Sequence, residues 1–232
     1  MRKEVGCVMK AMILAAGLGT RMQPLTQEIP KPLLKVGKLT LIELLINNLI
    51  NSGVKEFVIN ISYLGEQIKA ALEPFNRITK ITFLEEPFPY GTGGALINAR
   101  EHLGKDPFLL SSADIIFKPD LNKLPNYTDT IHLIATNNPD HNQLGDFSLD
   151  EGVVFLNADT NDFTYSGVAL INPKILDEHL SSKYPYDIWN TLFKPLILRS
   201  EATAHFDNSL WIDVGTPERL KLAREVVKDE NH

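Results

Sequence analysis

The chain has 232 residues, 44% of them hydrophobic, with a formal net charge of -6 and a single cysteine. This length and apolar content suit one domain with a sizeable core and exclude an intrinsically disordered protein, while an acidic chain without a basic stripe is not expected to bind nucleic acid. One cysteine excludes an internal disulfide and indicates a reducing compartment, and no apolar run reaches the ~18 residues that a membrane span needs.

The first predicted element is a buried strand that ends in a glycine-rich turn. Residues 1–8 lack the apolar core of a signal peptide, so we expect a cytoplasmic protein with a short N-terminal extension and one domain over residues 9–232. The apolar run breaks at Ala16-Gly-Leu-Gly19, where glycine permits a tight turn and a close ligand approach. Successive backbone N–H groups in such a turn bind anions, and Arg21 and Lys31 add positive charge. The stretch predicts a polyphosphate site.

Two familiar phosphate loops do not fit this turn. A Walker loop needs Gly-Lys-Ser/Thr, whereas Gly19 is followed by Thr20 and Arg21. A dinucleotide fingerprint needs a third glycine where Met22 stands. A purely structural strand-turn-helix corner is the remaining alternative.

Strands and helices then alternate along the chain. Helical spacing covers residues 41–50, with Gly53 at the expected cap, and strand-like residues 56–61 precede helical residues 64–72. A strand over 78–84 leads through a loop to a helix over 95–101, and a strand over 108–112 ends just before Asp114. This alternation predicts an α/β fold of Rossmann-like type, with a mixed, mainly parallel sheet and helices on both faces.

From Thr130 the strands become shorter and turns more frequent, which predicts a small antiparallel, substrate-facing subregion. Helices are expected over residues 173–180 and 186–198, before a strand-like stretch over 210–216 and a final helix over 217–228. Ligands bind beyond the carboxyl ends of parallel strands, where the glycine turn, the loop over 91–94 and Asp114 all lie. A carboxylate there beside a polyphosphate is a suitable Mg²⁺ ligand, although a turn aspartate is the structural alternative.

The glycine-rich stretch resembles a known family signature. Leu14-Ala-Ala-Gly-Leu-Gly-Thr-Arg-Met22, with Pro24-Leu-Thr26 and Pro30-Lys-Pro-Leu33, is similar over about twenty positions to the sugar-1-phosphate nucleotidyltransferases. The resemblance implies the nucleotidyltransferase fold, which is like that of the GT-A class. It also implies a catalytic set of Arg21, Lys31, Asp114 and Asp213, in which the two aspartates bind Mg²⁺. Asp213 stands in Trp211-Ile-Asp-Val-Gly-Thr216, which matches the family's second metal motif, whereas Ala113 replaces a family glycine.

The resemblance also assigns the substrate-binding residues. The loop from Glu86 to Gly94 resembles the family's base-recognising loop, with an ordinary Pro/Gly loop as the alternative. The implied nucleotide-binding residues are Leu14, Ala15, Ala16, Gly17, Gly19, Thr20, Arg21, Glu86, Gly91 and Thr92. Segments 138–147 and 163–170 are similar to the N-acetylmuramate-1-phosphate uridylyltransferases, a subgroup of like length without a C-terminal β-helix. The implied sugar-binding residues are Gly145, Asp146, Ser166 and Gly167.

The expected reaction joins a sugar-1-phosphate, with N-acetylmuramate 1-phosphate favoured, to a nucleoside triphosphate, with UTP favoured, in peptidoglycan recycling. No Ser/His/Asp or Cys/His nucleophile set is present in the sequence, which agrees with direct transfer assisted by Mg²⁺. Rival enzymes are a hexose- or heptose-1-phosphate guanylyl- or uridylyltransferase and a phosphocholine cytidylyltransferase. A non-catalytic nucleotide-sugar sensor is the rival of another class. We expect no nucleic-acid or membrane partner and a monomer or weak dimer.

Overall fold

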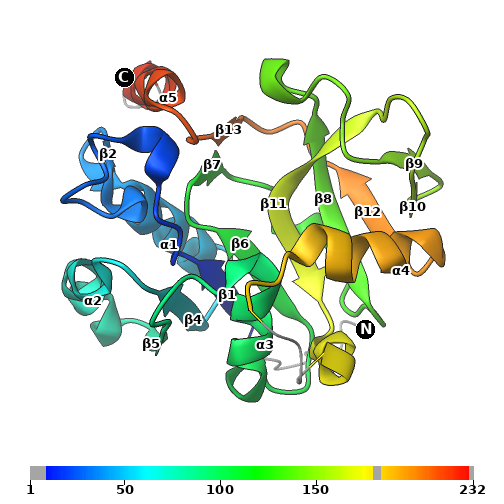
Figure 1. Ribbon diagram of the computed structural model, residues 1–232, viewed down its shortest axis with the longest axis horizontal. Coiled ribbons are helices and arrows are strands. Elements are labelled where there is room, and N and C mark those ends of the chain that lie inside the picture. The colour runs from blue at the N-terminus through cyan, green and yellow to red at the C-terminus, as the bar shows by residue number, and fades with distance from the viewer. Residues whose placement is uncertain (1–8, 180–183, 230–232) are drawn as a thin grey trace.

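The computed structural model describes residues 9–179 and 184–229, so the extension predicted over residues 1–8 lies outside the described residues. Nine strands form one mixed sheet in the order β5-β4-β1-β6-β11-β8-β12-β10-β9 (Figure 1). Its parallel half contains β1 (Lys10–Leu14), β4 (Glu56–Ile61), β5 (Lys80–Glu85) and β6 (Phe108–Ser112). The predicted mainly parallel α/β architecture is therefore confirmed.

The second half of the sheet is mixed. It contains β8 (Ile131–Asn137), β9 (Ser148–Asp150), β10 (Val153–Phe155), β11 (Phe163–Ile171) and β12 (Ala202–Phe206). Strand β11 runs antiparallel to both β6 and β8, and β9 and β10 form an antiparallel pair. The expected antiparallel region is present, but it continues the main sheet, and β12 pairs with β8 in parallel.

Helices cover both faces of the sheet (Figure 1). Helices α1 (Leu41–Asn51) and α2 (Gly65–Leu72) pack on the face that receives Ala11 and Ile13 of β1. Helices α3 (Gly91–Leu103) and α4 (Lys194–Leu198) pack on the face that receives Met12. Side chains alternate between faces along a strand, so a fully apolar strand is what two covered faces require.

Local sequence signals explain the ends of α1. The Thr40 hydroxyl accepts a hydrogen bond from the Glu43 N–H at 3.3 Å, and the Glu43 carboxylate accepts one from the Thr40 N–H at 2.7 Å. This capping box satisfies two donors that the first turn would leave unpaired. At the other end, Gly53 has a φ of 96°, which glycine adopts without steric cost.

A third apolar cluster attaches the C-terminal helix near the glycine turn. Helix α5 (Pro217–Asp229) packs against the two-stranded sheet of β7 (Ile115–Phe117) and β13 (Trp211–Asp213). Its Leu220 and Ala223 share this cluster with Met22 of the glycine-rich stretch. A small hairpin of β2 (Lys35–Val36) and β3 (Leu39–Thr40) completes this side of the molecule. The packing brings Asp213 and the glycine turn to the same side.

Three predicted helices differ from the structure. Helix α3 begins at Gly91 rather than Ala95, and residues Pro173–His179 form 3-10 helix. The helix expected over 186–198 is a π-helical turn over Trp189–Phe193 followed by α4. Leu180, the last residue of the helix expected over 173–180, lies outside the described residues. Within residues 9–179 and 184–229, none of the helices has the length and apolarity that crossing a membrane requires.

A histidine pair makes the stability of the fold depend on pH. His132 is buried in β8, and its ring nitrogens lie 2.8 Å from Thr203 Oγ1 and 2.8 Å from His205 Nδ1. Burial, and then the neighbouring His205, lower the pKa of His132 from 6.5 to about 4. As the pH falls from 6.5 toward 4, the unfolded chain binds a proton that the folded chain excludes. The free energy of unfolding should therefore fall, by at most about 3 kcal/mol from His132.

Urea unfolding between pH 4.5 and pH 7 tests this prediction. His132→Gln should flatten the pH dependence of the free energy of unfolding in this window, although His205, whose pKa is also lowered by burial, keeps part of it. The exposed His102 provides a matched control, because His102→Gln should leave the wild-type pH dependence in place. An unchanged slope in His132→Gln would contradict the assignment.

Candidate active site

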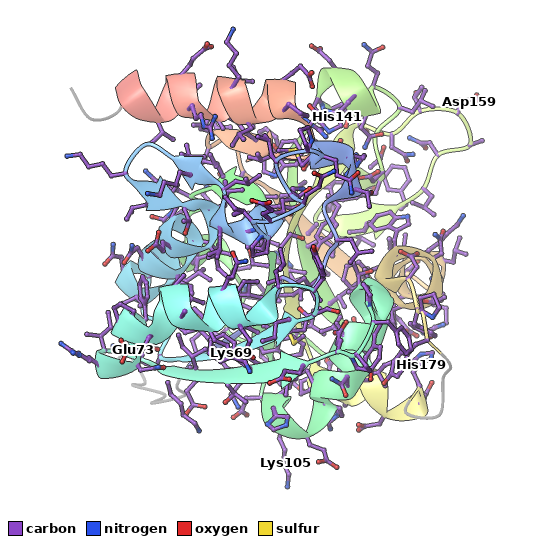
Figure 2. The ribbon with its side chains drawn as sticks, turned by 60° about the vertical axis from the view of Figure 1, so that its left-hand side comes forward. Lys69, Glu73, Lys105, His141, Asp159 and His179 are labelled. Carbon is purple, nitrogen blue, oxygen red and sulfur yellow. The ribbon has the colours of Figure 1, made fainter. Side chains whose placement is uncertain are left out.

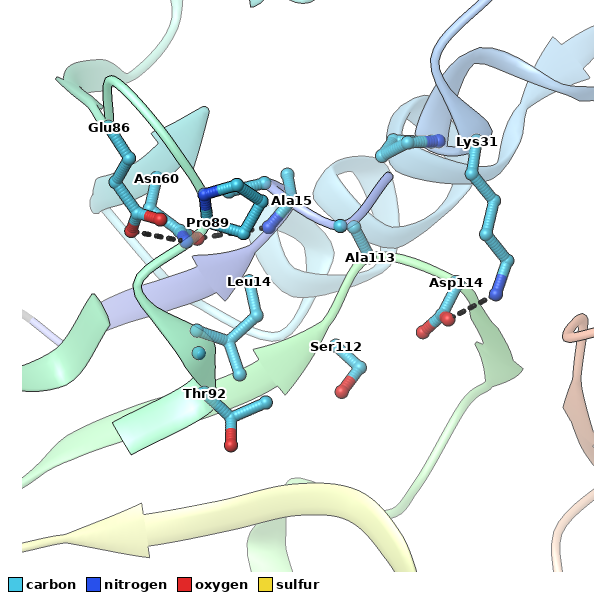
Figure 3. A pocket seen from close by; sticks show the side chains of 14 residues that line it. Leu14, Ala15, Lys31, Asn60, Glu86, Pro89, Thr92, Ser112, Ala113 and Asp114 are labelled. Carbon is cyan, nitrogen blue, oxygen red and sulfur yellow. Dashed lines mark hydrogen bonds and ion pairs between the residues drawn. The ribbon is translucent and has the colours of Figure 1, made fainter. Parts of the chain in front are cut away.

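A cavity of about 200 Å³ opens at the carboxyl ends of β1, β4 and β6 (Figure 3). Nine of the residues predicted to bind nucleotide or act in catalysis line it: Leu14, Ala15, Ala16, Gly17, Lys31, Glu86, Gly91, Thr92 and Asp114. Gly19, Thr20, Arg21 and Asp213 are not part of its lining. The cavity also has lining residues that the sequence did not single out for binding: Pro32, Asn60, Pro89, Ser112 and Ala113.

The glycine turn combines an open backbone with a fixed frame. A Cβ atom at Gly17 would meet nothing within 4 Å, so a ligand can approach the main chain there. Gly19 has a φ of 62°, and a Cβ atom there would lie 3.0 Å from Thr26 Cγ2. The Thr26 hydroxyl donates to the Gly19 carbonyl at 2.7 Å, which holds the turn in shape. These features suit a phosphate-binding backbone.

A buried network forms one end of the cavity, and the sequence interpretation missed its central residue. The Ala15 N–H donates to Asn60 Oδ1 at 3.0 Å, and Asn60 Nδ2 donates to Glu86 Oε1 at 2.8 Å (Figure 3). Glu86 Oε2 accepts from the Tyr90 N–H at 2.8 Å. Burial raises the pKa of Glu86, while the bonds from Tyr90 and Asn60 oppose that rise. Asn60 thus connects the glycine turn to the predicted base loop.

The signal that could have revealed Asn60 is its place in the sequence. It is the one amide in the otherwise apolar C-terminal half of Glu56-Phe-Val-Ile-Asn-Ile61, and it is 4% exposed. A buried amide needs hydrogen-bond partners, so a polar residue near the carboxyl end of a central strand indicates a network at the site.

Lys31 and Asp114 lie at the other end of the cavity, and Asp213 lies close to Asp114 outside the lining. Lys31 Nζ forms a short ion pair with Asp114 Oδ2 (Figure 3). Asp213 is the last residue of β13 and pairs with Ile115 of β7, the residue that follows Asp114. The Val214 N–H donates to the Asp114 carbonyl at 2.9 Å. Asp213 Oδ2 lies 3.0 Å from Arg219 Nη1 and 3.6 Å from His141 Nε2. Both predicted metal ligands therefore face a cationic or titratable partner.

The donor set fits a magnesium ion that also binds phosphate. The side chains of Asp114 and Asp213 are 34% and 24% exposed, and Asp213 pairs with Ile115, the residue that follows Asp114. The described residues hold no group of three or more His, Cys, Asp and Glu that could bind a metal. Magnesium commonly takes one or two carboxylates and completes its shell with phosphate and water, so two aspartates are enough. The predicted pairing of Asp114 with Asp213 remains a prediction.

The start of α3 is packed closely against the segment over 184–188. The N–H groups of Gly93 and Gly94 donate to the Tyr186 carbonyl at 2.8 and 3.1 Å. The Thr92 hydroxyl accepts from the Ile188 N–H at 3.0 Å. Cβ atoms at Gly91 and Gly93 would lie 2.6 and 2.5 Å from Tyr186 atoms, so these glycines permit the contact. The predicted base loop is therefore fixed from two sides.

The predicted sugar-binding residues do not line this cavity. Ser166 is fully buried, its hydroxyl accepts from the Val168 N–H at 3.3 Å, and its carbonyl accepts from Trp211 Nε1 at 2.8 Å. The Asp146 carboxylate accepts from Asn142 Nδ2 and the Tyr165 N–H. The close approach of Asn161 leaves no room for a Cβ at Gly145. A Cβ atom at Gly167 would lie 3.3 Å from Oγ of the lining residue Ser112.

Known proteins share this sequence and fold. A profile described as nucleotidyl transferase matches residues 10–230. The N-acetylmuramate alpha-1-phosphate uridylyltransferase of Neisseria meningitidis is 36% identical over 233 residues, which cover 93% of this chain and 97% of that protein. The mannose-1-phosphate guanyltransferase of Saccharomyces cerevisiae is 30% identical over 236 residues, which cover 90% of this chain and 62% of the yeast protein.

A solved structure shares the fold. A candidate glucose-1-phosphate thymidylyltransferase of Bacillus anthracis superposes with a TM-score of 0.84 at 19% identity, over 95% of this chain and 96% of that chain. At this identity the likeness supports the fold alone, whereas the profile and the relatives above carry the family assignment. The chain belongs to the nucleotidyl transferase family and is a sugar-1-phosphate nucleotidyltransferase.

Proposed function

We propose that the protein is an N-acetylmuramate-1-phosphate uridylyltransferase, which uses UTP and releases UDP-sugar and pyrophosphate in peptidoglycan recycling. The observation that carries the proposal is the 36% identity to the Neisseria enzyme, which extends over 93% of this chain and 97% of the relative. The segments over 138–147 and 163–170, which resemble this subgroup in sequence, add to it. A cytoplasmic location remains a prediction.

The arrangement of charge suits direct phosphoryl chemistry. An oxygen of the sugar phosphate would attack the α-phosphorus of UTP, forming the new P–O bond as the bond to the β-phosphate oxygen breaks and pyrophosphate leaves. The attacking oxygen is already ionised, so no strong general base is needed, and positioning with charge neutralisation does the work. In this reaction Lys31 would bind the α-phosphate or the incoming phosphate, and Arg21 would bind the departing pyrophosphate.

The base and the phosphates of the nucleotide would bind at opposite ends of the cavity. The base would lie against the loop from Glu86 to Gly91, because Asn60 holds that loop beside the glycine turn. The phosphates would lie toward Lys31 and Asp114 at the opposite end (Figure 3). Asp114 and Asp213 would hold Mg²⁺, which, when bound, neutralises phosphate charge and aligns the reacting groups.

A guanylyltransferase acting on a hexose 1-phosphate is the second candidate. It is favoured by the mannose-1-phosphate guanyltransferase of yeast, which is 30% identical over 90% of this chain. That protein is considerably longer, since the match covers 62% of it. The first candidate is favoured by the higher identity, 36% against 30%.

A substrate panel tests the proposal. The four nucleoside triphosphates, each with Mg²⁺, would be combined with N-acetylmuramate 1-phosphate, N-acetylglucosamine 1-phosphate and mannose 1-phosphate, and both pyrophosphate and the nucleotide sugar would be measured. We expect the highest kcat/KM for UTP with N-acetylmuramate 1-phosphate. A preference for GTP with mannose 1-phosphate would support the second candidate, and nucleotide binding without pyrophosphate release would identify a sensor.

A further inference from the structure

Arg219 lies in the first turn of α5 but does not point away into solvent. Its side chain is 16% exposed and extends back over Gly215 toward β13, where Nη1 lies 3.0 Å from Asp213 Oδ2. A Cβ atom at Gly215 would lie 2.2 Å from Arg219 Nη2. Glycine at position 215 therefore leaves the space in which the guanidinium lies.

This guanidinium has donors that the folded chain leaves unused. Nε and Nη1 of Arg219 are both buried and have no hydrogen-bond partner among residues 9–179 and 184–229, because the contact to Asp213 has the distance of an ion pair but not the alignment of a hydrogen bond. A buried donor without a partner is costly, and a charge-assisted hydrogen bond to a phosphate oxygen would satisfy such a donor. Donors of this kind suit an oxyanion ligand.

A second guanidinium lies near Arg219. Arg219, Asp213, Arg21 from the glycine-rich stretch and Asp140 all lie close enough to His141 to interact with it electrostatically. His141 lies beside the start of α5 (Figure 2), and its ring is stacked at 6.3 Å from that of Trp211. Two guanidinium groups thus lie near the Asp213 carboxylate, with the carboxylate of Asp140 beside His141.

Resting on the proposed function, we propose that Arg219 is a phosphate-binding residue, which Asp213 holds until a divalent cation takes its carboxylate. The cation and the guanidinium compete for the same oxygen, Asp213 Oδ2. With a cation held by Asp213, the guanidinium of Arg219 would be free to bind phosphate oxygens. Lys31 stands in the same relation to Asp114. Metal and phosphate binding are therefore coupled through these ion pairs.

Binding measurements on the full chain test this inference without turnover. Arg219→Gln would be compared with wild type and with Arg224→Gln, which removes the same charge from the exposed side of α5. With Mn²⁺ alone, Arg219→Gln should bind the metal several-fold more tightly, because the competing cation is gone. With Mn²⁺ saturating, it should bind inorganic pyrophosphate about tenfold more weakly, because the charge-assisted donors are gone.

The opposite directions of these two changes distinguish phosphate binding from a structural role. Weaker binding of Mn²⁺ by Arg219→Gln would mean that Arg219 only positions Asp213, and this would overturn the proposal. So would unchanged affinity for both pyrophosphate and a sugar 1-phosphate. If Arg219→Gln does not fold, Arg219→Lys keeps the charge and loses the fork, and it should retain wild-type Mn²⁺ affinity while binding pyrophosphate more weakly.

Steady-state kinetics then identify which phosphate Arg219 contacts. A higher KM for UTP, or weaker pyrophosphate binding, in Arg219→Gln places the contact on the triphosphate. A higher KM confined to the sugar 1-phosphate places it on the second substrate, and both results support the inference. The substrate panel can fail to favour N-acetylmuramate 1-phosphate without affecting the Mn²⁺ and pyrophosphate measurements, so the two proposals fail separately.

Discussion

Replacing Asp213 with asparagine should lower kcat by about 10²–10³ while the protein stays folded, since that is the usual effect of removing one electrostatic stabiliser of a transition state. Asparagine keeps the shape of the side chain but carries no charge, so it binds a divalent cation poorly. The backbone pairing of β13 with β7 and the half-buried position of the side chain are unaffected. The measurement is kcat at saturating UTP, sugar 1-phosphate and Mg²⁺, alongside the free energy of unfolding.

A charge-matched control separates this effect from a general change in net charge. Asp150 is exposed on β9, at the edge of the sheet, and Asp150→Asn should keep the wild-type kcat. Arg21→Ala and Lys31→Ala should resemble Asp213→Asn in keeping the fold and losing most turnover. Wild-type turnover in Asp213→Asn would remove this residue from the reaction and, with it, the two-aspartate metal site.

The sequence was most informative where local pattern and long-range packing agree. Strands β1, β4 and β6 are mostly apolar because both faces of the sheet are covered, so their positions and the meeting of their carboxyl ends could be predicted. The motif around Gly17 and Gly19 and the strand-tip position of Asp114 followed from the same reading. Nine predicted residues consequently line one cavity.

Prediction was weakest where a contact between distant segments decides local structure. Gly91-Thr-Gly-Gly94 has the composition of a loop, yet it forms the first turn of α3 because a segment more than 90 residues later packs against it. The π-helical turn over Trp189–Phe193 is another case. Pro195 lacks the N–H that a regular helix would donate to the Thr191 carbonyl, so the preceding turn is free to widen.

The side-chain contacts agree better with some of the roles assigned through resemblance than with others. Lys31 and Asp114 form an ion pair at the cavity, as charged residues of one site would. Ser166, by contrast, is fully buried and supports Trp211, and the oxygens of Asp146 bind neighbouring groups. A motif specifies residue types in order, but it does not reveal which member holds the backbone and which faces the ligand. The sugar-binding residues remain predictions for that reason.

Gly91→Ala should reduce the free energy of unfolding by about 3 kcal/mol and raise the KM for UTP. Gly91 has a φ of 78°, and a Cβ atom there would lie 2.6 Å from the Tyr186 carbonyl oxygen and 2.9 Å from the Tyr186 nitrogen. The left-handed conformation costs alanine about 1–2 kcal/mol, and displacing packed backbone costs about 1–3 kcal/mol more. Because the segment over 184–188 holds the start of α3, the base end of the cavity would move with it.

Gly53→Ala is the matched control, since Gly53 has a φ of 96° but a Cβ atom there would meet nothing within 4 Å. Gly53→Ala should reduce the free energy of unfolding only by the cost of the left-handed conformation, about 1–2 kcal/mol, and it should keep the wild-type KM for UTP. The difference between the two variants in urea unfolding then measures the contact between α3 and Tyr186. Equal losses in both variants, with equal KM values, would mean that this contact yields easily and does not hold the base loop in place.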